Sequence, residues 1–277
     1  TAKGTVSNTE GDKIQIVTAA GLEGSTAEAK PGYSFTGWYN GEALASEDAV
    51  LTAEEAKAAL NKDENGNYAD TEFVARFTEK ENVTLYYVAN PSGGGSVTNS
   101  QESLKPATEQ SKGSTASAAN GYEFVNWTVG EEVVGENPVL TPEEVDAVAK
   151  ASGAYEETTF TANFRIDQDA KETVAYQAEA GGSVTPERND IQIVTAEGLT
   201  GSTAEAKPGY SFTGWYKGED LITEATTLSK EEAKAQLNTA ADGTYKSTTF
   251  VAKFTPDPEA TADVAYVSED TAKGTVS

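Results

Sequence analysis

Three tryptophans are the side chains of this chain best suited to bind a ligand. Trp38, Trp127 and Trp215 each follow a Gly-Tyr-x-Phe pattern, so each occupies the same position of a repeated segment. An exposed indole in such a position could stack on a sugar. Small cores also need large aromatic side chains, and repetition at one strand position favours packing over binding. We therefore expect the three indoles to pack over a helix or a module junction.

The acidic side chains could bind calcium near the linkers between repeats. Asp167 lies close to Asp169, and Asp257 lies close to Glu259 and Asp263. No segment has the spacing of an EF-hand loop, so a solvated acidic surface is the favoured interpretation. The net charge of −25 disfavours nucleic acid and anionic lipid as partners. We expect no metal and no cofactor.

The absence of Cys and His excludes several kinds of catalysis. Neither a Ser-His-Asp nor a Cys-His arrangement can form, and no disulfide or thiolate is available. Composition permits a carboxylate pair for glycoside hydrolysis, but no acidic residue recurs in a cleft-forming context in every repeat. The chain is therefore expected not to be an enzyme. No apolar run approaches the ~18 residues of a membrane span, so we expect no membrane insertion.

Internal repetition defines the organisation of the chain. The octapeptide at 32–39 recurs unchanged at 209–216 and in divergent form at 121–128. Residues 14–77 align without a gap with 191–254, and 43 of these 64 positions are identical. We predict module A at 1–80, which lacks its first strand, module B at 81–168 and module C at 169–258. Residues 259–277 would supply the first strand and turn of a following module.

Each module predicts the same succession of elements. In module C we expect strands at 173–178, around Val184, at 191–195, at 210–216 and at 250–254. The alternation at 210–216 predicts a core of Tyr210, Phe212, Phe250 and Leu237, with Trp215 on the other face of its strand. Every module also has a capping box that predicts a helix of about three turns. These boxes are Thr52 with Glu55, Thr141 with Glu144, and Ser229 with Glu232.

The segments at 181–184, 209–216 and 249–254 resemble the Listeria–Bacteroides repeat, also called the internalin B-type repeat. Module B departs from the pattern at Asn126 and Thr128. The resemblance implies a small β-grasp-like fold in a bacterial surface protein, where such repeats form stalks or adhesive segments. Together with the predicted elements it gives an α+β class. The chain would be a tandem array of β-grasp-like modules, each a mainly antiparallel sheet with one short helix.

The two ends of the chain complement each other. Residues 1–7 are repeated unchanged at 271–277. Module A has no strand ahead of its first turn, whereas the tail carries 264–267 with no module after it. The chain is either a segment of a longer array or a unit that donates its tail strand to a neighbour. The duplication favours the array. Both alternatives predict a strand-exchange or inter-module junction, formed by Val264, Tyr266, Val267, Thr5 and Val6.

These observations predict a structural repeat segment of a bacterial extracellular fibre or giant adhesin stalk, assembled head-to-tail. Its partners would be copies of itself or adjacent repeat modules at the bacterial cell surface. The alternative is an adhesive module that binds a host or matrix glycan through its Trp-bearing strands. A host protein is the remaining class of partner.

Overall fold

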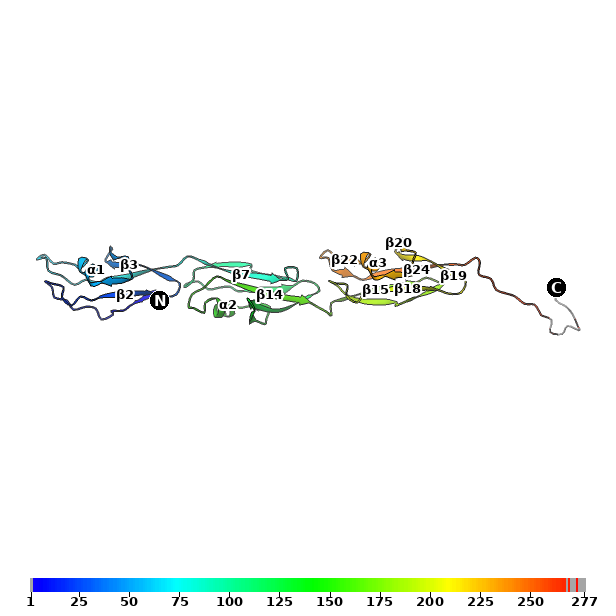
Figure 1. The fold of residues 1–277 in the computed structure, drawn as a ribbon, viewed down its shortest axis with the longest axis horizontal. Helices are drawn as coiled ribbons and strands as arrows, with labels where there is room; N and C mark the ends of the chain where they lie inside the picture. Colours follow the sequence, from blue (N-terminus) through cyan, green and yellow to red (C-terminus); the bar gives the residue numbers. More distant parts are fainter. Residues whose placement is uncertain (1, 268, 270–272, 274–277) are drawn as a thin grey trace. The chain divides into compact units, whose positions relative to one another are not determined.

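The computed structural model describes residues 2–267, 269 and 273 (Figure 1). The chain divides into two compact units. Unit 1 runs to Ala119 and includes Phe124–Arg165, while unit 2 contains Asn120–Glu123 and the chain from Ile166 onward. Strands account for 47% of the chain and helices for 7%. The fold is therefore mostly β, with several antiparallel sheets and few short helices, where the sequence predicted an α+β class.

Module C contains a five-stranded mixed sheet in unit 2, with the order β17-β15-β24-β19-β20. The strands β15 and β24 are parallel neighbours at its centre, and the other pairs are antiparallel. Phe250 lies opposite Tyr176 in the parallel pair. The bounds of these strands are β15 Lys171–Ala178, β17 Arg188–Gln192, β19 Tyr210–Lys217, β20 Asp220–Thr223 and β24 Thr248–Pro256.

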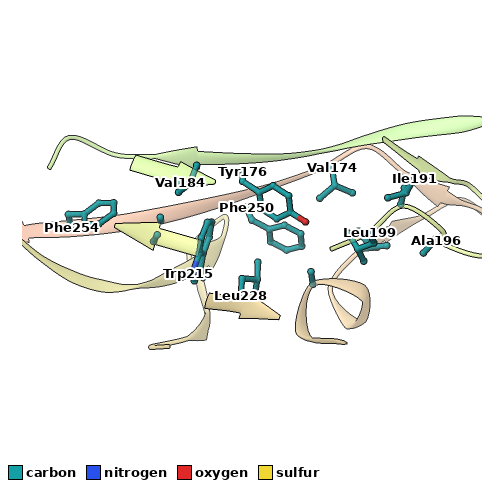
Figure 2. Close-up of a cluster of buried hydrophobic side chains, with 14 residues drawn as sticks. Val174, Tyr176, Val184, Ile191, Ala196, Leu199, Trp215, Leu228, Phe250 and Phe254 are labelled. Atoms are coloured by element: carbon teal, nitrogen blue, oxygen red, sulfur yellow. The ribbon is translucent and has the colours of Figure 1, made fainter. Parts of the chain in front are cut away.

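A smaller antiparallel sheet faces this one across the core of module C. It has the order β16-β18-β21, and the helix α3 (Lys230–Ala235) follows β21 directly. Figure 2 shows Tyr176, Trp215, Leu228 and Phe250 pointing toward one another in the interior. The remaining strands are β16 Gly182–Thr185, β18 Gly201–Ala206, β21 Thr227–Ser229, and the paired β22 Asn238–Thr239 and β23 Tyr245–Lys246.

A β-bulge in β19 changes which side chains enter the core. The register shifts between Phe212 and Gly214, where Gly214 has a φ of +153°. The extra residue turns Trp215 to the same face as Phe212, and the two rings lie 6.4 Å apart. The predicted opposite placement of Trp215 is therefore wrong. Tyr210 was predicted in the core, yet it is 37% exposed at the start of the strand.

The three predicted helices are present, and their capping boxes are confirmed. Thr52, Thr141 and Ser229 each accept a hydrogen bond from the backbone N–H of the glutamate three residues later, and the carboxylate of that glutamate accepts one from the backbone N–H of the cap residue. The helices α1 (Ala53–Ala58) and α3 have six residues each and α2 (Pro142–Ala149) has eight. They are shorter than the predicted three turns, so packing must hold them in place.

Module B, most of which lies in unit 1, has the same two sheets. The larger has the order β12-β11-β14-β7-β9 and the smaller β13-β10-β8. Its central strands β7 and β14 are again parallel, with Phe160 opposite Tyr87. The bounds are β7 Val83–Asn90, β8 Gly95–Val97, β9 Gln101–Leu104, β10 Ser114–Ala118, β11 Tyr122–Val129, β12 Glu132–Gly135, β13 Val139–Leu140 and β14 Thr158–Ile166.

Module A differs from the other two because its larger sheet has only three strands in the described part of the chain. That sheet has the order β4-β3-β6, and the smaller sheet has the order β1-β2-β5. Among the described residues, no counterpart of the central strands β7 and β15 lies beside β6. The bounds are β1 Gly4–Val6, β2 Gly24–Ala29, β3 Tyr33–Asn40, β4 Ala43–Ser46, β5 Val50–Thr52 and β6 Phe73–Glu79.

Two predicted strands have a different outcome in the structure. The strand expected at 191–195 ends at Gln192, because the Gln192 side chain accepts hydrogen bonds from Val194 N (2.6 Å) and Thr195 N (2.8 Å) and forms a turn. Residues 264–267 lie in no strand within the described chain. The turn expected after them falls largely on residues outside the described ones.

A strand-sized groove in module A as the candidate functional site

The described residues cover the core of module A on one side only. Trp38, Leu51 and Ala56 are buried, as are their equivalents in module C. In contrast, Phe73 and Ala75 on β6 are only partly buried, although their equivalents Phe250 and Ala252 have no exposed surface. The uncovered side is the one that β15 covers in module C.

A cavity of about 800 Å³ occupies this uncovered side. Its apolar lining comes from both sheets and from α1. Removal of a single core side chain leaves a void on the order of 150 Å³, so the missing volume corresponds to several side chains. The groove therefore has the size of a missing strand. Side chains that line it include Val6, Leu22, Trp38, Leu51, Ala56 and Phe73.

In modules B and C a tyrosine from the opening strand fills the equivalent space. Tyr176 stacks on Phe250 with ring centroids 5.9 Å apart and meets Trp215 edge-on at 6.0 Å. Tyr87 stacks on Phe160 at 5.5 Å and meets Trp127 edge-on at 6.2 Å. The cores of modules B and C are thus each built around a Tyr, a Phe and a Trp. Module A supplies only Phe73 and Trp38 from its described residues.

The hydroxyl of this tyrosine has a dedicated acceptor in both complete modules. Tyr176 Oη donates to Asn189 Oδ1 at 2.8 Å, and Tyr87 Oη donates to Glu102 Oε1 at 2.7 Å. Asp12 holds the equivalent place in module A, because it accepts a hydrogen bond from Glu23 N at 2.9 Å, just as Asn189 accepts one from Thr200 N at 3.0 Å. Asp12 also lines the groove. The acceptor for a tyrosine hydroxyl is therefore present.

The electrostatics of the groove favour a neutral tyrosine hydroxyl that donates a hydrogen bond to an ionised carboxylate. Burial raises the pKa of Asp12, but hydrogen bonds from the Glu23 and Gly24 amides and from Asn8 outweigh it, so the net pKa is lowered. In module C, burial raises the pKa of Tyr176 to about 12, against a smaller lowering by the Gly201 backbone. An ionised Asp12 can only accept, which matches the donor capacity of a tyrosine hydroxyl.

The outer edge of β6 has no strand partner among the described residues. In module C, Val174 lies opposite Thr248 and Tyr176 opposite Phe250 along the corresponding edge. The positions equivalent to Thr248 and Phe250 in module A are Thr71 and Phe73. An open edge of this kind presents backbone donors and acceptors to another strand.

The predicted junction residues lie in different places in the structure. Thr5 and Val6 lie in β1, where they pair with Glu28 and Ala27 on β2. The side chain of Val6 lines the groove. Val264, Tyr266 and Val267 are 71%, 77% and 85% exposed. The structure therefore brings Val6 to the site, while the pairing of the tail remains a prediction. The sequence analysis did not identify Asp12 and Phe73 as site residues, although the repeat alignment makes Phe73 the equivalent of Phe250.

The Trp residues are core residues, as the repeat argument favoured. Trp38 is 2% exposed, and Trp127 and Trp215 have no exposed surface. Their indole N–H groups donate to the backbone oxygens of Ala49, Pro138 and Thr226 at 3.0 to 3.1 Å. The hypothesis that these rings stack on a glycan is therefore wrong, because the rings are inside the modules.

The described residues contain no group of three or more His, Cys, Asp and Glu side chains arranged to bind a metal ion. The expectation of no metal remains a prediction. Within the same part of the chain, no helix has the length and apolar character that crossing a membrane requires.

Comparison with known families agrees with the repeat organisation. Residues 173–256 match the Listeria-Bacteroides repeat domain, and residues 86–168 match the divergent InlB B-repeat domain. The resemblance seen in the sequence is thereby confirmed. Both repeat families are typical of bacterial surface proteins. No curated protein and no solved structure matches the chain.

Proposed function

We propose that this chain, whose modules B and C belong to the InlB B-repeat and Listeria–Bacteroides repeat families, is a structural segment of a bacterial extracellular fibre or adhesin stalk. It acts by mechanical connection and not as an enzyme. Its modules join head-to-tail at the bacterial cell surface. The parallel central strands of modules B and C, together with the helix in every module, support a β-grasp-like assignment.

The observation that carries this proposal is the match between the groove of module A and the tail of the same chain. The tail segment Val264-Ala265-Tyr266 is identical to Val174-Ala175-Tyr176, the part of β15 that fills module C. In the register of module C, Tyr266 would lie opposite Phe73. Its ring would then enter the cavity, with its hydroxyl near Asp12.

Strand addition of this kind would stabilise both partners. It pairs the open edge of β6 and buries the exposed ring of Tyr266 together with Phe73. The donor and acceptor surfaces are different, so the contact does not close on itself and generates a chain of copies. A chain of small modules joined in this way is suited to a stalk.

The experiment compares the intact chain with variants of the tail. Sedimentation velocity over a concentration series should show end-to-end association of the 1–277 chain, and hydrogen exchange should show protected amides at 264–267. The Tyr266→Ala variant should lose both. The matched control is Tyr86→Ala, which removes a tyrosine that is 36% exposed on another strand. Intact chains that remain monomeric with unprotected tail amides would contradict the proposal.

A further inference from the structure

We infer that the loop Gln15–Thr18 of module A is a docking face for a second copy of this chain. The occupant is the end of module C, namely the turn Pro208–Tyr210 and the linker 257–260. This inference rests on the head-to-tail order proposed above. It concerns a contact distinct from strand addition, and two equivalent contacts within the chain carry it.

The first equivalent contact lies inside unit 1, where the turn of module A meets module B. Gly32 is buried there, and a Cβ on it would lie 2.9 Å from Ala107 Cβ and 3.0 Å from Ala154 Cβ. The linker is fixed to the same turn, because Lys80 N donates to Gly32 O at 2.9 Å. A side chain at Gly32 would therefore prevent the contact.

The second equivalent contact lies inside unit 2, which contains the turn residues 120–123. Gly121 is buried, and a Cβ on it would lie 2.5 Å from Val194 Cγ2. Asp167 N again donates to the glycine oxygen, at 2.9 Å. The receiving loop binds the linker directly, since Ile193 N donates to Ala170 O at 3.1 Å and Gln192 Nε2 donates to Asp167 O at 3.2 Å.

The loop of module A has the same conformation as the receiving loop of module C. Ile16 O accepts a hydrogen bond from Tyr68 N at 2.7 Å, as Ile193 O does from Tyr245 N at 2.7 Å. The residues that adopt a left-handed conformation, Ala19 and Ala196, have φ angles of +59° and +60°. The face in module A is thus already in the shape that receives a turn.

Within the part of the chain that the structure describes, the same loop is uncovered in module A alone. Ile16 is 59% exposed and Val17 is 71% exposed, whereas Ile193 is 6% exposed and Val194 is partly buried. In module B the equivalents Pro106 and Ala107 are buried and partly buried. Two adjacent apolar side chains therefore lie in solvent at the position where the other modules receive a neighbour.

The complementary turn of module C is formed and equally uncovered. Asp257 N donates to Gly209 O at 2.9 Å, and Ala260 N donates to Asp257 O at 3.2 Å, which repeats the hydrogen bond from Ala170 N to Asp167 O. Yet Gly209 is exposed, and a Cβ on it would meet no described atom within 4 Å. This turn has the donor conformation of the other two and lacks their partner.

An engineered cysteine pair tests the contact directly, because the natural chain has no cysteine. A Cβ on Gly121 would lie 2.5 Å from Val194 Cγ2. The Cβ atoms of these two positions are therefore at most about 4 Å apart, within the range of a disulfide. Chains with Gly209→Cys and chains with Val17→Cys should therefore form a covalent heterodimer on mild oxidation. The control pairs Val17→Cys with Gly218→Cys, since Gly218 is also exposed with a positive φ of +61°. Equal crosslinking of both pairs would overturn the inference.

A charge substitution provides a second test. Val17→Asp should weaken association at least about tenfold, because the carboxylate would be buried against the incoming turn. The control Val133→Asp changes a valine that is 50% exposed elsewhere. If Val17→Asp associates like the intact chain while amides 264–267 are protected, the docking face is wrong and strand addition stands. If the tail amides are unprotected in the intact chain, the proposed function fails, and crosslinking alone decides the docking face.

Discussion

The open groove predicts that one substitution will have unequal effects at two equivalent positions. Phe73 and Phe250 occupy the same place in modules A and C, on strands of nearly the same sequence. Phe250 has no exposed surface and stacks on Tyr176. Phe73 is only partly buried, because it faces the cavity of about 800 Å³. Replacement by alanine should therefore destabilise module C far more than module A.

The expected magnitudes follow from burial. Phe250→Ala removes a fully buried ring and leaves a void, at a cost of about 3–5 kcal/mol in the free energy of unfolding. Phe73→Ala removes a partly buried ring beside a groove that is already open, so no new void adds to the loss. Half of the transfer free energy of a phenylalanine gives roughly 1–1.5 kcal/mol. The difference should be at least about 1.5 kcal/mol.

Native-state hydrogen exchange can measure the two modules separately within the intact chain. The amides of β6 and β24 should report the stability of modules A and C under increasing urea. The measurement belongs at concentrations at which the chain is monomeric, because a donated strand would cover Phe73. Equal losses for the two variants in the monomer would refute the interpretation of the groove as an unfilled core.

Three further results are expected from module C and its helix. Tyr176→Phe should cost about 1 kcal/mol, because it removes the hydrogen bond to Asn189 while Asn189 keeps its bonds to Thr200; urea unfolding measures it. Alkaline titration should destabilise module C by up to about 3 kcal/mol as the pH rises from 10 to about 12. Burial raises the pKa of Tyr176, so the folded module favours the neutral hydroxyl, and the stabilisation from this preference is complete only below pH 10. Tyr176→Phe should lack this loss. Ser229→Ala should cost about 1 kcal/mol through loss of the cap of α3, visible as faster exchange of the Glu232 amide.

Features with local signals were predictable from the sequence. The capping boxes at Thr52, Thr141 and Ser229 mark the starts of the helices, because a cap depends on residues three positions apart. The prediction of the closing strand was also correct, because Phe250, Ala252 and Phe254 are buried in alternation. The repeat period placed these elements in every module, since each copy provides independent evidence for the others.

The sequence analysis missed features that depend on an irregular backbone. A period of two assigns Phe212 and Trp215 to opposite faces, but the bulge before Gly214 brings both into the core. The sequence contained a signal, because an isolated glycine in a strand is typical of a bulge. The exposure of Tyr210 has a different cause, since it lies next to Gly209 at a turn with no described neighbour.

The position of the groove was predictable from the sequence, but the hydrogen-bond acceptor inside it was not. Comparison with β7 and β15 indicates that no described residue of module A supplies the strand expected beside β6. The role of Asp12 follows only from the hydrogen bond of Tyr176 to Asn189, which joins residues 13 positions apart through the tertiary fold. Sequence comparison aligns Asp12 with an asparagine and gives no reason to connect either residue with a tyrosine.

The two proposed contacts belong to one junction, because the segments that would form them are contiguous in the chain. In unit 2 the linker ends at Ala170, whose oxygen accepts the hydrogen bond from Ile193, and β15 begins at the next residue, Lys171. By the same spacing the linker of module C ends at Ala260, and a donated strand would begin at Thr261. One end of a copy would thus deliver the turn, the linker and the strand to module A of the next copy. The open groove and the open loop both lie on module A, whereas the uncovered turn and tail both lie at the end of module C, so such an assembly has a single direction.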